Sequence, residues 1–589
     1  IRTTLRNPKG VIVGSVQSGM PEHTHQTCTE VRLPALTLEN PQLWSCESPQ
    51  LYNAEVVVTA DGMVVDSLTE QFGIRSLEFS PEFGFKLNGK KIFLQGNANH
   101  HDLGALGATC YDKAIERMML QLKSFGYNCI RCSHNPYSDS FARIADRVGI
   151  LVVDELTDKW SDNDYWGGRQ PFTHIWHKLI TEWIKRDRNR PSIILWSLGN
   201  ELQIREGWAG FEGTNDWGIT TYNIFNQLVK RWDHTRLTTV AMFPARAGAI
   251  TRHDKEFNDY LVPPELACAT EVASFNYQSD KYDAYLKYRP DLILFQSEAE
   301  TSNLLQPYYN MDKERMVGIA YWGSVEYWGE SNKWPKKGWN YSFFEHTMRP
   351  YPQAYLIKTA FMPEIPEVHI GVVDAAGAES VSWNDVIVGR MALNECWNHT
   401  PGSRRSLFTF TNAHSVELLV NGQSMGIQKN DTTRANLRNM IYWKDVPYGN
   451  GGSVVAIARD KSGKEVARHR IETAGKAVAL RIEAETPTDW KADGMDLQYI
   501  NVTVIDKKGR PVWDYNEPLT LQMEGAARLV ALDNGDHYTD ELFHGITSKR
   551  MYQGRMQIIL RSDQEAGNVT VKISSAGLKG TLRLKTIKE

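Results

Sequence analysis

The spacing of apolar and polar residues divides the chain into a central region and two flanking regions with a different pattern. Residues 30–77 alternate apolar and polar positions between Pro, Gly and Asn turns. From about residue 364 the alternation returns, and residues 407–411 and 416–420 have the pattern of hairpin strands. Short strands with frequent turn signals are typical of antiparallel sandwiches. We therefore predict immunoglobulin-like β-sandwiches on both sides of the central region.

The central region, from about residue 90 to 360, alternates continuous apolar runs with amphipathic stretches. This pattern is typical of parallel strands covered by helices. Helical periodicity predicts helices over residues 113–125, 139–148 and 174–186. Eight strand–helix units over about 270 residues match a (β/α)8 barrel, which takes roughly 250. The eight predicted strands are residues 91–96, 127–132, 150–154, 193–198, 237–242, 272–277, 292–296 and 317–322.

We thus predict a multidomain protein with a central (β/α)8 TIM barrel flanked by immunoglobulin-like β-sandwich domains. The chain of 589 residues fits about three to six domains at ~100–200 residues each. The predicted domains are an N-terminally truncated sandwich at 1–77, the barrel at 78–363, a sandwich at 364–475 and a C-terminal immunoglobulin-like sandwich at 476–589.

Composition excludes several partner classes. A net charge of −4 without a long basic run gives no electrostatic footprint for nucleic acid or an anionic membrane. Seven scattered cysteines are not a disulfide framework. Cys129 and Cys132 have CxxC spacing but lie within a predicted strand, so we expect buried thiols rather than a zinc or redox site. The 18 Trp residues exceed what core packing requires, which hints at stacking against flat ligand faces.

Polar residues follow the predicted barrel strands, at the rim where barrel enzymes carry their active sites. The rim has no Lys at a strand end, no Gly-rich phosphate loop and no HExxH pair. Two carboxylates over an aromatic floor suit glycoside hydrolysis, although a single Glu at a strand end can equally be a solvated or ion-paired residue. The rim residues are Asn97, Asn99, His100, His101, Asp102, Arg131, His134, Asn135, Asp154, Glu155, Asn200, Glu201, Asn276, Tyr277, Glu298, Glu300, Trp322 and Glu326.

Seven segments carry a family resemblance: 41–45 (PQLWS), 72–75 (FGIR), 85–90 (FKLNGK), 95–107 (QGNANHHDLGALG), 130–136 (IRCSHNP), 153–155 (VDE) and 186–201, which ends in SLGNE. With these motifs the chain resembles glycoside hydrolase family 2, the family of bacterial β-galactosidases, β-glucuronidases and β-mannosidases. The β modules after residue 364 resemble those of secreted family members. The resemblance therefore implies a secreted or periplasmic protein, with a cytoplasmic location left open because this chain carries no signal peptide.

The resemblance also implies roles for individual residues. Glu201 corresponds to the catalytic acid/base, and Asn200 beside it to the residue that contacts the sugar 2-hydroxyl. Glu298 corresponds to the nucleophile, with Glu300 as its competitor. The expected substrate-binding residues are His100, Arg131, His134, Asp154, Asn200, Tyr277, Trp322 and Glu326, with Asp154 alternatively a core partner of Arg131.

The expected activity is that of a retaining exo-β-glycosidase acting on an oligosaccharide or glycoside. Among such activities, that of a β-galactosidase is favoured. The alternatives are a β-glucuronidase or another β-glycosidase of the family, or a catalytically inactive carbohydrate-binding protein. Adjacent Asn332 and Lys333 miss the Asn-x-Lys element of glucuronidases by one residue, and they keep an acidic sugar open. We predict no cofactor, since the ligands of the magnesium that family β-galactosidases can carry have no match here, and a divalent cation is left open. A homo-oligomer is left open.

Overall fold

The computed structural model describes residues 1–19, 31–160, 172–202, 216–243, 262–302, 304–331, 334–374, 379–383 and 386–588. They divide into two compact units, each described here by itself. The first unit comprises Ile1–Gly96, Asn128–Ser297 and Asp312–Ile319. The second unit comprises Asn97–Tyr127, Glu298–Met311 and Ala320–Glu589. Among the described helices, none combines the length and hydropathy that a bilayer crossing requires.

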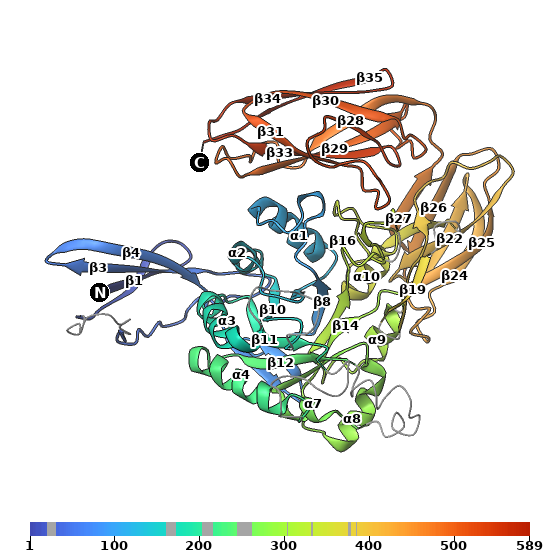
Figure 1. Cartoon of the computed structure of the whole chain (residues 1–589). Coiled ribbons are helices and arrows are strands. Elements are labelled where there is room, and N and C mark those ends of the chain that lie inside the picture. Colours follow the sequence, from blue (N-terminus) through green and yellow to red (C-terminus); the bar gives the residue numbers. More distant parts are fainter. Residues whose placement is uncertain are drawn as a thin grey trace. The chain divides into compact units, whose positions relative to one another are not determined.

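Eight parallel strands form a closed barrel in the order β10-β11-β12-β13-β14-β15-β8-β9. The predicted barrel is confirmed, and each strand lies within about three residues of its predicted run, because strands buried on both faces leave long apolar runs in the sequence. Figure 1 shows α2, α3 and α4 outside the neighbouring strands β10 to β12. The strands are β8 (Leu94–Asn99), β9 (Cys129–Cys132), β10 (Leu151–Glu155), β11 (Ile193–Asn200), β12 (Leu237–Met242), β13 (Val272–Asn276), β14 (Leu294–Ala299) and β15 (Gly318–Trp322).

The helices begin and end where local chemistry requires it. Ser138 caps α2 by accepting a hydrogen bond from the Phe141 N–H, and Gly149 ends the helix at φ 77°. A Cβ at Gly149 would lie 2.4 Å from the Cys46 carbonyl oxygen, so only glycine fits this turn. The helices are α1 (Asp112–Ser124), α2 (Asp139–Val148), α3 (Phe172–Asp187), α4 (Ile219–Trp232), α7 (Glu265–Ala269), α8 (Tyr282–Tyr288), α9 (Leu305–Asn310) and α10 (Ala354–Phe361), with short 3-10 turns η1 (Gly104–Leu106) and η2 (Ser279–Lys281).

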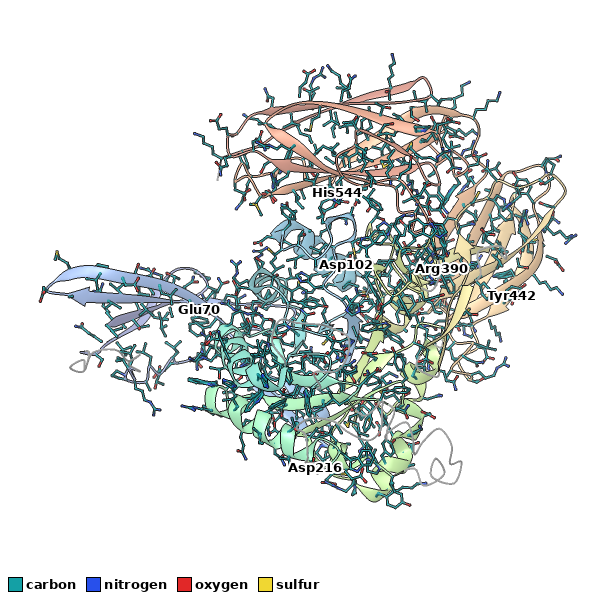
Figure 2. The ribbon with its side chains drawn as sticks, viewed as in Figure 1. Glu70, Asp102, Asp216, Arg390, Tyr442 and His544 are labelled. Atoms are coloured by element: carbon teal, nitrogen blue, oxygen red, sulfur yellow. The ribbon has the colours of Figure 1, made fainter. Side chains whose placement is uncertain are left out.

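The described part of the N-terminal region forms one antiparallel sheet in the order β2-β1-β3-β4. Glu70 of β4, labelled in Figure 2, accepts a 2.8 Å hydrogen bond from Arg190 of the barrel. Arg75 donates to the Pro191 and Ile193 carbonyl oxygens at 2.6 and 3.0 Å. These contacts join the sheet to the barrel within the first unit. The strands are β1 (Arg2–Arg6), β2 (Ile12–Gln17), β3 (Tyr52–Ala60) and β4 (Met63–Phe72), followed by β5 (Leu77–Ser80), β6 (Gly84–Leu87) and β7 (Lys90–Lys91).

Two pairs of four-stranded antiparallel sheets make up most of the second unit. Sheet β21-β18-β22-β25 shares a core with β24-β23-β26-β27, and β28-β29-β33-β31 shares one with β32-β30-β34-β35. The strands are β18 (Val368–Val373), β21 (Leu393–Asn394), β22 (Arg404–Thr411), β23 (Ser415–Val420), β24 (Gln423–Lys429), β25 (Met440–Pro447), β26 (Ser453–Arg459), β27 (Glu465–Glu472), β28 (Ala477–Ala484), β29 (Leu497–Asp506), β30 (Pro518–Gly525), β31 (Ala527–Asp533), β32 (Ser548–Arg550), β33 (Arg555–Ser562), β34 (Asn568–Ser575) and β35 (Leu578–Lys585). Short pairs β16 (Tyr327–Trp328) with β17 (Gly338–Trp339) and β19 (Glu379–Trp383) with β20 (Val386–Arg390) complete the described strands.

The last pair of sheets packs against the segment that follows β8. Ala105, Leu106 and Ala114 share a buried cluster with Tyr499 and Ile559. At the edge of this contact, Arg117 of α1 forms a two-pronged ion pair with Glu485, with nitrogen–oxygen distances of 2.7 and 2.9 Å.

The abundance of Trp has a structural explanation that differs from the predicted one. Trp44, Trp160, Trp196 and Trp490 are fully buried. Their ring N–H groups donate to Asp146 O, Leu198 O, the Asp233 carboxylate and Asp496 O, respectively. The hint of ligand stacking from the Trp count does not apply to these four residues, because each buried indole has a partner inside the fold.

Candidate active site

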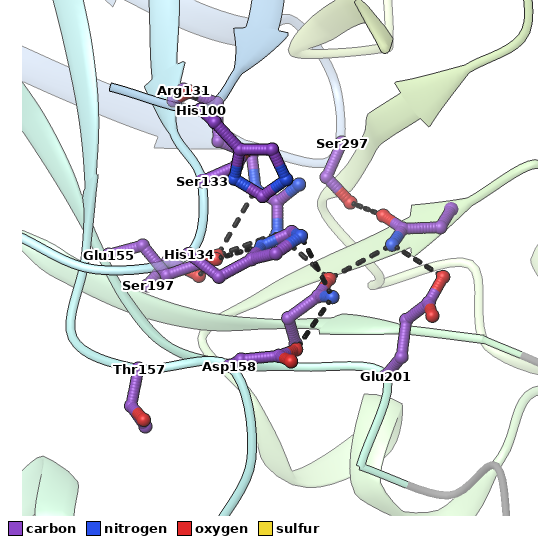
Figure 3. A network of polar contacts seen from close by, with 12 residues as sticks. His100, Arg131, Ser133, His134, Glu155, Thr157, Asp158, Ser197, Glu201 and Ser297 are labelled. Carbon is purple, nitrogen blue, oxygen red and sulfur yellow. Dashed lines mark hydrogen bonds and ion pairs between the residues drawn. The ribbon is translucent and has the colours of Figure 1, made fainter. Parts of the chain in front are cut away.

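A buried ion pair anchors the polar network at the carboxyl ends of β9 to β13 (Figure 3). The Arg131 guanidinium donates to Glu155 Oε2 at 2.7 and 3.1 Å, and both residues have no exposed surface. The Ser197 hydroxyl donates to the same oxygen at 2.7 Å. Burial alone would raise the pKa of Glu155, but Arg131 and His134 hold that pKa below its ordinary value. Glu155 is therefore an anion that fixes the position of Arg131.

Asn200, the last residue of β11, lies at the centre of this network. Its Oδ1 accepts from Arg131 at 2.9 Å and from Asn276 at 3.0 Å. Its Nδ2 donates to Asp158 at 3.2 Å and lies 3.3 Å from His134 Nε2. Because guanidinium and amide N–H groups can only donate, these contacts set the orientation of the Asn200 amide.

The tautomer of His134 follows from the same contacts. Its Nδ1 lies 2.7 Å from Glu155 Oε1, and an anionic carboxylate can only accept. The Nδ1 therefore carries the proton when the ring is neutral, and Nε2 accepts from Asn200. His134 thus ties the ion pair to the asparagine.

Glu201 follows Asn200 directly, and 6% of its surface is exposed. Its Oε1 accepts a 3.1 Å hydrogen bond from Asn276 Nδ2, and Asn276 Oδ1 accepts from the Ser297 hydroxyl at 2.8 Å. The backbone of Glu201 has φ 47°, in the left-handed region that non-glycine residues rarely occupy. Strained backbone of this kind is concentrated at functional sites. The turn at the end of β11 holds the carboxylate at the barrel rim.

Glu298 and Tyr277 also lie at barrel strand ends. Glu298 belongs to β14 and is 3% exposed, whereas Glu300 follows the end of the strand and is half-buried. Tyr277 comes directly after β13 and has φ 58°, the second strained strand end of the rim. Of the two competing glutamates, Glu298 is the one that the barrel itself positions.

In the second unit, His100 and Trp322 belong to an aromatic cluster. The His100 ring meets the edges of Trp322 and Tyr327 at centroid distances of 5.1 and 4.9 Å. Tyr327 in turn stacks on Trp339 at 6.0 Å. His100 Nε2 lies 3.6 Å from a Glu330 carboxylate oxygen, and the Tyr327 hydroxyl donates to the same carboxylate. Trp322, Tyr327 and Trp339 are buried in this cluster, and His100 is the partly exposed member.

Asp154 does not pair with Arg131, although pairing with Arg131 was one of our two predictions for it. Its carboxylate accepts a 2.6 Å hydrogen bond from Trp183 Nε1 of α3, while Glu155 takes Arg131. Burial and the neighbouring Asp187 raise the pKa of Asp154 well above its ordinary value. Adjacent residues of a strand point to opposite faces, so Asp154 faces the helix layer. This orientation does not fit a place in the pocket shell.

Glu326 also departs from its predicted role in binding substrate. Its side chain has no exposed surface. Oε1 accepts from the Tyr351 hydroxyl at 2.6 Å, and Oε2 lies 3.0 Å from ring nitrogens of both His346 and His537. The structure thus places Glu326 in a buried cluster instead of on an open pocket wall.

Several members of the network were not selected from the sequence. Glu155 and Asn276 appeared among the polar residues at the strand ends, so that position was the signal that could have found them. Ser197 lies inside an apolar run, where a single serine gives no signal. Ser297 directly follows the run at 292–296, and the sequence does not predict its contact with Asn276. Asp158 lies in the segment that follows β10, and the sequence does not predict its contact with Asn200.

The remaining candidates divide between described and undescribed residues. Asn332 and Lys333 lie outside the described residues. Lys336 is buried, with Nζ 4.1 Å from the centre of the Tyr341 ring. Cys129 and Cys132 are buried in β9, and burial raises the pKa of both thiols. Among the described residues, two clusters bring His, Cys, Asp or Glu ligand atoms together. Neither cluster contains Glu201. We therefore derive no step through a metal at the acid/base.

Comparison with known families agrees with the fold and with the strand-end motifs. Profiles described as "Glycosyl hydrolases family 2", "Glycosyl hydrolases family 2, TIM barrel domain" and "Glycoside hydrolase family 2 C-terminal domain 5" match residues 1–75, 82–313 and 480–582. A domain of unknown function, DUF4982, matches residues 402–467. The chain belongs to glycoside hydrolase family 2, and by that membership it is a glycoside hydrolase.

Individual relatives extend the likeness along nearly the whole chain. A putative β-glucuronidase of Formosa agariphila is 42% identical over 96% of this chain, which covers 55% of that protein. A β-galactosidase of Bacteroides ovatus is 27% identical over 92% of this chain, which covers 67% of that protein. A family 2 structure from Bacteroides cellulosilyticus superposes with a TM-score of 0.84 at 28% identity, covering 99% of this chain and 73% of that one.

Proposed function

We propose that the protein is a retaining exo-β-glycosidase with β-galactosidase activity, in which Glu298 is the nucleophile and Glu201 the acid/base. The observation that carries this proposal is the placement of Glu201. It is a buried carboxylate in a strained turn at the end of β11, held by Asn276 and adjacent to an asparagine whose amide orientation is set. Family 2 membership supports the reaction class.

In the first step, a Glu298 carboxylate oxygen attacks the anomeric carbon while the bond to the leaving oxygen breaks. Glu201 gives its proton to that oxygen, so the aglycone departs as an alcohol. In the second step, Glu201 takes a proton from water. The resulting hydroxide equivalent attacks the same carbon and breaks the bond to Glu298. Two inversions retain the configuration, and both carboxyl groups return to their starting protonation.

Asn200 supports this reaction by its fixed orientation. Its Oδ1 is occupied by Arg131 and Asn276, so its polar contacts are set before substrate arrives. The sugar 2-hydroxyl would take over one of the longer Nδ2 contacts, those of 3.2 and 3.3 Å with Asp158 and His134, and that hydrogen bond strengthens in the transition state. The ion pair between Arg131 and Glu155 acts through Asn200 and is therefore a positioning device.

The sugar is proposed as galactose, with glucuronic acid as the alternative. The relatives named above carry both activities in their names. A panel of four aryl β-glycosides (galactoside, glucuronide, mannoside and glucoside) tests the choice. A galactoside preference of less than about tenfold in kcat/KM, equivalent to about 1.4 kcal/mol, would contradict it.

A 2-fluoro β-glycoside with an activated leaving group tests the nucleophile. The fluorine slows both steps, whereas the leaving group restores the first, so the covalent intermediate accumulates. Intact mass should rise by one fluoroglycosyl group, and peptide mapping should place the group on Glu298. Glu300→Gln is the matched control and should still be labelled. A label on Glu300, or no label with any of the four sugars, would refute the assignment.

Glu201→Gln tests the acid. Leaving groups that need protonation should lose ~10²–10⁴-fold in kcat/KM. Activated aryl glycosides should lose much less in kcat/KM, because this ratio reports the first step only and their first step needs no acid. Equal loss on both substrate types would count against an acid role for Glu201.

A further inference from the structure

We propose that Glu326, His346 and His537 form a binding site for a divalent transition-metal cation of the Zn²⁺ type. The three residues come from distant parts of the sequence: the segment after β15, the segment before α10 and the loop after β31. They meet inside the second unit, and the proposal does not depend on the hydrolase reaction.

The three candidate ligand atoms converge closely. Glu326 Oε2 lies 3.0 Å from His346 Nδ1 and 3.0 Å from His537 Nδ1. All the candidate ligand atoms of the group lie within 4.8 Å of one another. Zinc binds imidazole nitrogen and carboxylate oxygen at about 2.0–2.2 Å in tetrahedral geometry, so its ligand atoms lie roughly 3.3 Å apart. The two spacings from Glu326 Oε2, 3.0 Å each, are close to that value.

His346 is arranged as a metal-binding histidine. Its Nε2 lies 2.9 Å from Asp533 Oδ1, with both side chains at most 1% exposed. A carboxylate on one ring nitrogen holds the proton there and turns the lone pair of the other nitrogen toward the metal. The Nδ1 of His346 faces Glu326 Oε2 at 3.0 Å, so a cation would bind this nitrogen in place of the proton that the contact holds. Asp533 is the outer partner that orients it.

The contacts of the buried His537 ring point most directly to a bound cation. It is 4% exposed, and neither of its ring nitrogens makes a hydrogen bond with the described residues. Its Nδ1 lies near Glu326 without hydrogen-bond geometry. Its Nε2 faces Gly338, where a Cβ would lie only 2.9 Å away. A buried imidazole without hydrogen bonds is costly, and a metal at Nδ1 would give the ring one polar partner.

The surroundings of the three ligands are largely aromatic. The Trp328 ring packs on His346 and His537 at centroid distances of 4.6 and 4.8 Å, and Phe543 packs on Trp328 at 5.4 Å. Glu326 Oε1 is occupied by the Tyr351 hydroxyl, so the carboxylate can offer one oxygen only. Two nitrogens and one oxygen leave one position of a tetrahedral cation for water.

A second His–Glu–His cluster shows the contrast and supplies a control. His369, Glu395 and His469 also converge, but His469 Nδ1 accepts the Ile370 backbone N–H at 3.0 Å. A neutral imidazole that accepts at Nδ1 carries its proton on Nε2, the nitrogen that faces Glu395. That lone pair is absent, so His469 cannot serve as a ligand at this nitrogen, and we expect the cluster to bind no metal.

The test uses the full chain, stripped with a chelator and then freed of the chelator by gel filtration. Titration with Co²⁺ should produce the visible absorption of a low-coordinate ion, saturating at about one equivalent. No intense sulfur-to-cobalt band should accompany it, because the site contains no cysteine. One equivalent of Zn²⁺ should abolish the signal and remain bound in elemental analysis after gel filtration.

His537→Gln should lose this equivalent, whereas His369→Gln, the matched control, should keep it. Asp533→Asn should keep the stoichiometry but bind ~10–100-fold more weakly, as loss of an outer carboxylate does. If His537→Gln fails to fold, the titrations of the unmodified chain and of Asp533→Asn decide. Three results would overturn the proposal: less than about 0.2 equivalents bound by the unmodified chain, a sulfur–cobalt band, or equal binding by the two histidine variants.

Discussion

For the two adjacent carboxylates on β10, Glu155 and Asp154, we predict very different effects of nearly isosteric substitutions on stability. Glu155→Gln leaves the fully buried Arg131 without its anionic partner, and breaking a buried pair from one side costs ~3–5 kcal/mol. Asp154→Asn should cost less than about 1 kcal/mol. The pKa of Asp154 is raised well above its ordinary value, so a neutral side chain replaces a carboxyl group that burial already disfavours as an anion. The asparagine carbonyl can still accept from Trp183.

Hydrogen exchange of peptides that cover β9 and β10 measures this difference locally. A loss of ~3 kcal/mol raises the open fraction about 150-fold, so Glu155→Gln should exchange at least 100-fold faster there. Asp154→Asn should stay within about fivefold of the unmodified chain. Peptides from β28 to β35 should exchange equally in all three proteins.

The pH dependence has a definite sign. The lowered pKa of Glu155 contributes stability that is present above its unfolded value of about 4.3 and is lost as pH falls through the folded value. The two variants should therefore converge at low pH. If Glu155→Gln and Asp154→Asn were equally stable at pH 7, the assignment of the ion pair to Glu155 would be refuted.

Further predictions concern the acid/base and the helix turn. Asn276→Ala removes the hydrogen bond to the Glu201 carboxylate, worth ~1.5–3 kcal/mol for a charged acceptor, and kcat/KM should fall ~10–150-fold with KM little changed; an unchanged kcat/KM would contradict the role. Gly149→Ala puts a Cβ 2.4 Å from the Cys46 oxygen at φ 77° and should destabilise by more than ~1–3 kcal/mol in urea unfolding. Gly10→Ala has a similar φ of 79° with no atom within 4 Å, so it measures the backbone strain alone.

The barrel was predictable because its strands are buried on both faces. Such strands leave continuous apolar runs, and β11 is buried at every position. Their carboxyl ends meet at one rim, which is why the sequence alone could predict that Asn200 and Glu201 lie at that rim. Asp154 and Glu155 show the limit: the sequence does not say which of two adjacent carboxylates faces inward, and a one-residue difference reverses the answer.

Long-range contacts could not be predicted in the same way. His346 and His537 reach Glu326 from separate segments, and nothing in the local pattern around either histidine indicates this meeting. The Trp residues were misinterpreted for a related reason. Composition shows how many indoles there are, but the backbone carbonyls that accept from Trp44 and Trp160 are set by packing.

The contact between the last pair of sheets and the segment after β8 bears on how this protein can be shortened. Ala105 and Leu106 come only a few residues after His100, and they are covered by Tyr499 and Ile559. A chain cut near residue 475 would leave that surface bare beside a proposed sugar-binding histidine. By sequence, the last pair of sheets is thus a separate domain. For the segment after β8, however, it forms part of the buried packing. In shortened forms, the order of the segment around His100 should therefore be measured first. A loss of activity can be attributed to missing carbohydrate binding only if that segment remains ordered.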